Sequence, residues 1–199
     1  MADVNTQVQE LYVAYFNRPA DVAGLAYWSG VLAEDPNAYK AIAQDFSNSW
    51  EYMMTYNGLS NRQIVDTVYQ HLFGRAAESA GVDYWAKLLD QKALTVANVV
   101  TEVAHGAQGS DKVVIDGKVA VAAAFTSHLD TVLEQLAYTG VVANKTASAY
   151  LATIVDAPSA ERALAPENVD AAISQLAGPI VNPIFGVSAE VVGVPPAHA

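Results

Sequence analysis

The chain has 199 residues, of which 52% are hydrophobic and 16% charged, and its net charge is −11. This composition predicts a folded protein of one domain, or of two small ones at most. It contains no cysteine and no basic cluster, which excludes disulfides and cysteine-based metal sites and argues against a nucleic-acid partner. No stretch of about 18 apolar residues occurs, so we expect no membrane insertion, and the first residues lack the pattern of a cleavable signal peptide.

An internal repeat relates residues 8–32 to residues 65–89, which align without a gap when the chain is shifted by 57 residues. The first copy reads VQELYVAYFNRPADVAGLAYWSGVL and the second reads VDTVYQHLFGRAAESAGVDYWAKLL, with ten of 25 positions identical. Because about two identities would be expected by chance, the segments are copies of one structural unit.

Each copy predicts two helices separated by a break. The apolar residues before the break recur at i, i+3 and i+4, which is the spacing of one helix face. Asn17 and Gly74 come next, and both residue types tolerate the left-handed conformation that ends many helices. Asp21 is the expected N-cap of the second helix in the first copy, whereas Glu78 is less suited to that role in the second.

A third helix completes each copy. Gly24 and Gly81, in the second helix, predict a close approach between neighbouring helices. Further apolar spacing predicts the third helix at residues 38–53 and at residues 95–107. Each copy is therefore expected to form a three-helix module of about 55 residues that packs against the other.

Beyond the repeats, we expect helices at residues 113–139, 144–156 and 167–176, with Pro158 closing the second. The expected fold is an all-α helical bundle built from two three-helix repeats plus C-terminal helices, with an extended Pro/Gly/Val-rich tail. Its parts are the first repeat (1–57), the second repeat (58–112), the C-terminal helices of the same domain (113–177), and a linker or the start of a following domain (178–199).

The pattern Y-x-x-x-F-x-R-x-A-[DE]-x-A-G-[LV]-x-Y-W occurs from Tyr12 to Trp28 and again from Tyr69 to Trp85. It resembles the helical repeat of unknown function found in bacterial surface-layer (S-layer) and RTX-type secreted proteins. The segments Ser47–Met53 and Asp116–Leu129 are similar to elements that follow this repeat in those proteins.

This resemblance implies the N-terminal anchoring module of an S-layer protein. Such a module would bind cell-surface polysaccharide, the O-antigen of lipopolysaccharide, noncovalently and hold the self-assembled lattice on the cell, with calcium supporting the lattice. The resemblance also implies an extracellular location and export without a cleavable N-terminal signal. Two alternatives stay open. One is a protein–protein assembly module of an S-layer or RTX-type adhesin without direct glycan binding, and the other is a cytosolic scaffold like the helical modules of phycobilisome linkers.

The recurring aromatic pairs are candidates for glycan binding, because sugar rings stack on aromatic side chains. Neighbouring helical residues point about 100° apart, so one member of each pair can be buried and the other exposed. Tyr27 and Tyr84 are the expected glycan contacts. In the alternative interpretation, Trp28 and Trp85 belong to the core and the tyrosines fill helix interfaces.

Arg18 and Arg75 also recur, and a guanidinium can bind a carboxylate or phosphate on a glycan. Alternatively, each arginine forms an ion pair inside its own repeat with the acid three residues later, Asp21 or Glu78.

A segment dense in aromatic residues has no counterpart in the second copy, and its residues are Trp50, Tyr52, Met53, Tyr56 and Asn57. A feature present in only one copy favours a glycan or partner surface, and packing against the C-terminal helices is the alternative.

No pattern indicates catalysis, and we expect no enzyme. The four histidines lack metal-ligand spacing, and no glycine-rich phosphate loop occurs. Calcium is the one cofactor considered, with Asp21, Asp35 and Asp111 as candidate ligands, and no EF-hand or RTX nonapeptide loop is present.

Overall fold

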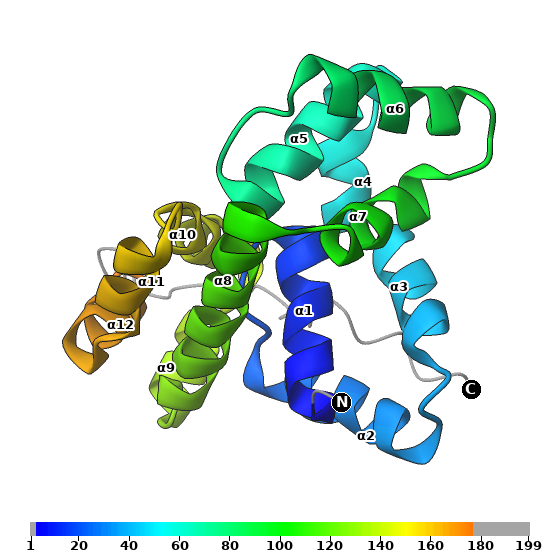
Figure 1. Ribbon diagram of the computed structural model, residues 1–199. Coiled ribbons are helices and arrows are strands. Elements are labelled where there is room, and N and C mark those ends of the chain that lie inside the picture. Colours follow the sequence, from blue (N-terminus) through cyan, green and yellow to red (C-terminus); the bar gives the residue numbers. More distant parts are fainter. Residues whose placement is uncertain (1–2, 177–199) are drawn as a thin grey trace.

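The computed structural model describes residues 3–176, and every regular element within them is an α-helix (Figure 1). The predicted all-α fold is therefore confirmed, and the tail predicted at 178–199 lies outside the described residues. The helices are α1 (Val4–Phe16), α2 (Val22–Glu34), α3 (Tyr39–Ser47), α4 (Trp50–Tyr56), α5 (Asn61–Phe73), α6 (Ser79–Asp90), α7 (Val96–His105), α8 (Gly109–His128), α9 (Val132–Ala137), α10 (Gly140–Ala152), α11 (Ala157–Leu164) and α12 (Pro166–Ser174).

The two sequence copies form equivalent helices, α1–α3 and α5–α7, and α1 packs against α5, α7 and α8. Asn17 ends α1 with a φ of 50° and Gly74 ends α5 with a φ of 65°, so both adopt the predicted left-handed conformation. The Asp21 carboxylate accepts a hydrogen bond from the Gly24 amide (2.7 Å) at the start of α2. Glu78 makes no such bond at the start of α6, in agreement with its weaker capping ability.

Gly24 of α2 and Gly81 of α6 each lie against a tyrosine of the preceding helix. A Cβ atom added to Gly24 would lie 2.2 Å from the Tyr12 hydroxyl oxygen, and one added to Gly81 would lie 3.2 Å from that of Tyr69. The predicted close approach is thus made by a tyrosine hydroxyl, and it is tighter in the first repeat.

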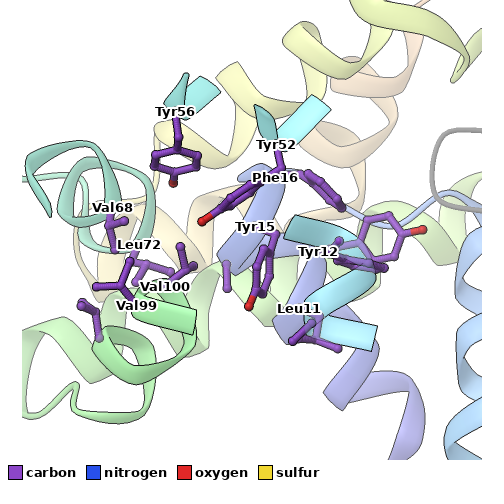
Figure 2. Close-up of a cluster of buried hydrophobic side chains, with 14 of the residues drawn as sticks. Leu11, Tyr12, Tyr15, Phe16, Tyr52, Tyr56, Val68, Leu72, Val99 and Val100 are labelled. Atoms are coloured by element: carbon purple, nitrogen blue, oxygen red, sulfur yellow. The ribbon is translucent and has the colours of Figure 1, made fainter. Parts of the chain in front are cut away.

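The two repeats share one hydrophobic core. Figure 2 shows its centre, where aromatic side chains of α1 meet those of α4 and apolar side chains of α5 and α7. Phe46 of α3 lies edge-on to Tyr12, with ring centroids 4.9 Å apart, and edge-on to Trp28 at 5.5 Å. Such edge-to-face contacts add to the stabilisation from burial. The labelled residues of this core are Leu11, Tyr12, Tyr15, Phe16, Tyr52, Tyr56, Val68, Leu72, Val99 and Val100.

Two helices predicted as continuous are broken. The helix expected at 38–53 divides into α3 and α4, because the Ser49 hydroxyl accepts a hydrogen bond from the Tyr52 amide (3.2 Å) and so caps a new helix. The helix expected at 113–139 divides into α8 and α9, because Thr131 and Glu134 form a reciprocal capping box. Ser and Thr favour caps over helix interiors, and their local hydrogen bonds outweigh the continuous apolar pattern here.

The prediction that Pro158 closes a helix is wrong. Pro158 lies in the first turn of α11, where its missing amide hydrogen leaves no bond unmade, and Asp156 caps this helix through the Ser159 amide (2.8 Å). The preceding helix, α10, ends earlier, at Ala152. Helix α11 was not expected from the sequence at all.

Helix α8 joins the repeats to the C-terminal helices. It packs on α1 and α5 on one side and on α11 and α12 on the other, and in Figure 1 it runs beside α1 with α10–α12 beyond it. Phe125 and Leu129, at the end of α8, share a buried cluster with Tyr138, Val169 and residues of α10 and α12. Within residues 3–176, no helix is both long enough and apolar enough to cross a bilayer.

Candidate functional site

The recurring arginines make equivalent ion pairs. Each pairs with an acid at the start of the helix that follows the three equivalent helices of its copy, α4 after α1–α3 and α8 after α5–α7. Arg18 holds Glu51 of α4 through Nε–Oε1 (2.8 Å) and Nη2–Oε2 (2.9 Å). Arg75 holds Asp111 of α8 through Nε–Oδ1 (2.8 Å) and Nη2–Oδ2 (2.7 Å). The predicted second-copy partner, Glu78, also contacts Arg75, at 2.7 Å.

The predicted partner of Arg18 was wrong, because Asp21 is used as a helix cap and Glu51 takes its place. Arg18 is only 1% exposed and lies against the rings of Tyr12 and Phe16. Arg18 is therefore not available to a glycan in this structure. Arg75 is more open, with a side-chain exposure of 35%, but its guanidinium is already paired with two acids. Each arginine therefore forms its ion pairs within its own repeat.

The recurring aromatic pairs divide as the two-sided helix geometry predicts. Tyr27 and Tyr84 are 41% and 58% exposed, whereas Trp28 is buried. Trp85 is partly buried, and its indole N–H donates to the Tyr69 hydroxyl (3.2 Å). The two tyrosines are thus accessible, each on the second helix of its repeat, but neither lines a groove with the other candidate residues.

The aromatic segment of α4 has an exposed side and a buried side. Trp50 is 70% exposed, whereas Tyr52 and Tyr56 are 3% and 4% exposed. The Tyr52 hydroxyl donates to the carbonyl oxygen of Val96, and its ring contacts that of Tyr56 in a tilted arrangement with centroids 4.5 Å apart. Burial raises the pKa of both phenols well above the ordinary value, so both stay protonated. These tyrosines shape the walls of the site, and the exposed ring is that of Trp50.

A groove of about 550 Å³ lies around α4 and brings Trp50, Tyr52 and Tyr56 together. Its volume lies in the range of small-molecule sites, which commonly combine apolar walls with a few polar groups. The exposed apolar side chains at the groove are Trp50, Met53 (47%) and Met54 (60%). The hydrogen-bonding side chains along it are Gln44, Ser47, Asn48, Asn57 and Asn61.

Of the amides, sequence reasoning singled out Asn57 as part of the aromatic segment and missed Gln44, Asn48 and Asn61. Gln44 and Asn48 lie one turn apart at the end of α3, and Gln44 Nε2 contacts Asn48 Oδ1 at 3.4 Å. Asn57 follows α4 and Asn61 begins α5, where its side chain donates to Asp90 (2.6 Å). The run S-N-S-W between α3 and α4 was the available signal, since its serines and asparagine favour a helix break that exposes polar side chains.

The second repeat does not reproduce this set of residues. When Asp111 is aligned with Glu51 through their arginine contacts, Ser110 stands in place of Trp50 and Lys112 in place of Tyr52. The aromatic segment is therefore specific to the first repeat, as the sequence indicated.

The candidate calcium ligands are used otherwise. Asp21 caps α2, Asp35 accepts from the Asn37 amide (2.9 Å), and Asp111 pairs with Arg75. Among residues 3–176, no three His, Asp or Glu side chains come together in a group that could hold a metal ion.

Comparison with known proteins identifies a family. The domain of unknown function DUF4214 matches residues 3–56 and 43–108, so the two overlapping matches cover both repeats. No curated protein and no solved structure matches the chain. Residues 3–108 are 106 of the 199 residues, and the chain therefore belongs to the family of the domain of unknown function DUF4214.

Proposed function

We propose that this chain is a polysaccharide-binding module, which attaches an S-layer protein noncovalently to the O-polysaccharide of lipopolysaccharide on the cell surface. The groove around α4 is the binding site in this proposal. The module would act outside the cell, and calcium would act on the lattice. Among the residues singled out from sequence, Trp50 makes direct contact with the glycan, while Tyr52 and Tyr56 support the groove.

The observation that carries the proposal is an exposed indole beside a row of amides. Trp50 makes no ring contact with any other described residue, so its face is free for a sugar ring. The amides of Gln44, Asn48 and Asn57 can both donate and accept hydrogen bonds, which matches the hydroxyl groups of a sugar. Exposed apolar side chains grouped in this way on a protein surface commonly mark a binding site.

Titration of the protein with smooth and rough lipopolysaccharide, with and without calcium, tests the proposal. We expect saturable binding to smooth material alone and a loss of about tenfold or more in affinity for Trp50→Ala. Tyr84→Ala is the matched control, because Tyr84 is a similarly exposed aromatic residue on a helix outside the groove. Absence of binding to smooth lipopolysaccharide by the folded protein, with calcium present, would refute the proposal. Equal losses for the two variants would assign binding elsewhere.

Self-assembly is a second candidate function, favoured by an exposed apolar surface on α9 and the start of α10. Its residues are Val132 (72% exposed), Leu133 (79%), Leu136 (60%), Val141 (63%) and Val142 (75%). Apolar surface of this kind is common at protein–protein contacts. Sedimentation velocity of the protein and of a Leu133→Glu, Leu136→Glu double variant tests it. Concentration-dependent association that the double variant lacks would support assembly, and a monomer at all concentrations would exclude assembly through this surface.

A further inference from the structure

We infer that the α4 groove selects uncharged sugar units and rejects acidic ones, so that its ligand is a neutral polysaccharide. This inference rests on the proposed function and specifies its ligand class. It follows from the charges of the groove and of its surroundings.

The groove itself carries no charge. None of the side chains that line it in the described part of the chain is Asp, Glu, Lys, Arg or His. Charged residues make up 16% of the sequence, so a site of this size without any is a distinctive chemical surface. Carboxylates and phosphates are usually recognised by Arg or Lys, and this groove has neither to offer them.

Acidic side chains adjoin the groove. Asp45 follows Gln44 on α3 and is exposed, and Asp90 contacts the groove residue Asn61. Two basic residues lie near the groove without lining it: Lys40, one turn before Gln44, and Arg62, which follows Asn61 and is paired with Asp83 (2.5 Å). An acidic sugar would approach these carboxylates and a protein of net charge −11 without gaining a cationic partner. A neutral sugar meets no such repulsion.

The uncharged groups suit a neutral sugar. A sugar ring has an apolar face of C–H groups, which can stack on the exposed indole of Trp50, and hydroxyl groups at its edge, which can bond to the amides. The flexible side chains of Met53 and Met54 can adapt to the next unit of the chain. The lipid-proximal part of lipopolysaccharide carries phosphates, so the same charge argument directs the module to the outer polysaccharide.

Chemically matched derivatives of one polysaccharide test the inference. The O-polysaccharide of the smooth lipopolysaccharide that binds is released from its lipid, purified, and converted in parallel to carboxymethyl and hydroxyethyl derivatives of equal substitution. The two derivatives carry groups of similar size, and only the first is charged. Binding of each to the full chain is measured by isothermal titration at low and at high salt.

We expect the hydroxyethyl derivative to bind and the carboxymethyl derivative to bind about tenfold more weakly at low salt, with the difference narrowing at high salt as charges are screened. Asp45→Lys is an informative variant, because Asp45 is exposed and adjoins the groove but does not line it. This variant should raise the affinity for the carboxymethyl derivative several-fold and leave the affinity for the hydroxyethyl derivative unchanged.

The outcomes separate the two proposals. If the carboxymethyl derivative binds as tightly as the hydroxyethyl one, and Trp50→Ala weakens both, selection for neutral sugars is wrong and the proposed function stands. If no lipopolysaccharide and no polysaccharide binds to the folded protein, the proposed function is wrong and the inference fails with it.

Discussion

Replacement of Glu51 with Gln would leave the Arg18 guanidinium buried without an opposite charge. The Glu51 carboxylate makes two hydrogen bonds to Arg18, of 2.8 and 2.9 Å, and the Arg18 side chain is only 2% exposed. The remaining acceptors close to the guanidinium are uncharged: the carbonyl oxygen of Pro19, at 3.1 Å, and the hydroxyl of Tyr138, at 3.5 Å. Because an uncompensated buried charge is strongly unfavourable, this substitution should lower the free energy of unfolding considerably.

The Arg75–Asp111 pair of the second repeat provides an internal control for the size of this loss of stability. Removal of one partner from a buried ion pair costs about 3–5 kcal/mol, and we expect the lower end for Glu51→Gln because that carboxylate is 20% exposed. Asp111→Asn removes the equivalent acid from Arg75, whose side chain is 35% exposed and still contacts Glu78. Solvent and this second acid compensate the charge, so a loss of about 1 kcal/mol or less is expected.

Urea unfolding followed by circular dichroism measures both losses. Similar m-values for the two variants and the parent protein would show that the same unfolding transition is compared. Equal losses, or a larger loss for Asp111→Asn, would refute the claim that the deeper burial of Arg18 makes its ion pair the more important one.

Three further predictions concern buried groups. Burial lowers the pKa of Lys118 from 10.5 to about 8, so above pH 8 the unfolded state binds more protons than the folded state. The free energy of unfolding should therefore rise by up to about 2 kcal/mol from pH 8 to 9.5. This rise should be absent in Lys118→Met when unfolding is measured across that range. Burial, together with nearby Lys118, lowers the pKa of His71 from 6.5 to about 4. The free energy of unfolding should therefore fall by up to about 3 kcal/mol as the pH drops from 6.5 to 4. His71→Asn should lose less stability over the same pH range. Gly24→Ala should lower the thermal midpoint of unfolding more than Gly81→Ala. The Cβ added at Gly24 would lie 2.2 Å from a tyrosine hydroxyl, against 3.2 Å at Gly81, and we expect Gly24→Ala to cost about 1–3 kcal/mol. Equal midpoints for the two variants would contradict this.

Features set by short segments of sequence could be predicted. Asn17 and Gly74 end their helices in the left-handed conformation because a residue's own backbone preference determines it. The partner of Arg18 could not be found in the same way, because Glu51 lies 33 residues away and is brought into place by the packing of α4. The sequence offered Asp21 as a nearer acid, but that carboxylate is already used by the amide of Gly24.

Within the candidate site, the aromatic segment could likewise be predicted from the sequence only in part. Its absence from the second copy identified Trp50, Tyr52 and Tyr56 together, and all three line one groove. Which rings are exposed depends on the direction in which α4 starts, and that direction is set by the cap at Ser49. A continuous helix, as first expected, would orient these side chains differently. The choice between Trp50 and the two tyrosines as the exposed ring therefore required the structure.

The same arginine contact holds the helix that follows each set of three equivalent helices, and these two helices, α4 and α8, differ in length. Arg18 holds Glu51 in the first turn of α4, which has 7 residues, and Arg75 holds Asp111 in the first turn of α8, which has 20. The longer helix continues between the repeats and the C-terminal helices, where Lys118 donates to the carbonyl oxygen of His71 near the end of α5. Helix α8 is packed on both sides, whereas α4 keeps Trp50 exposed. The arginine contact is thus a common scaffold. The residues that flank the paired acid, Trp50 and Tyr52 in the first copy but Ser110 and Lys112 in the second, account for the aromatic groove of the first copy.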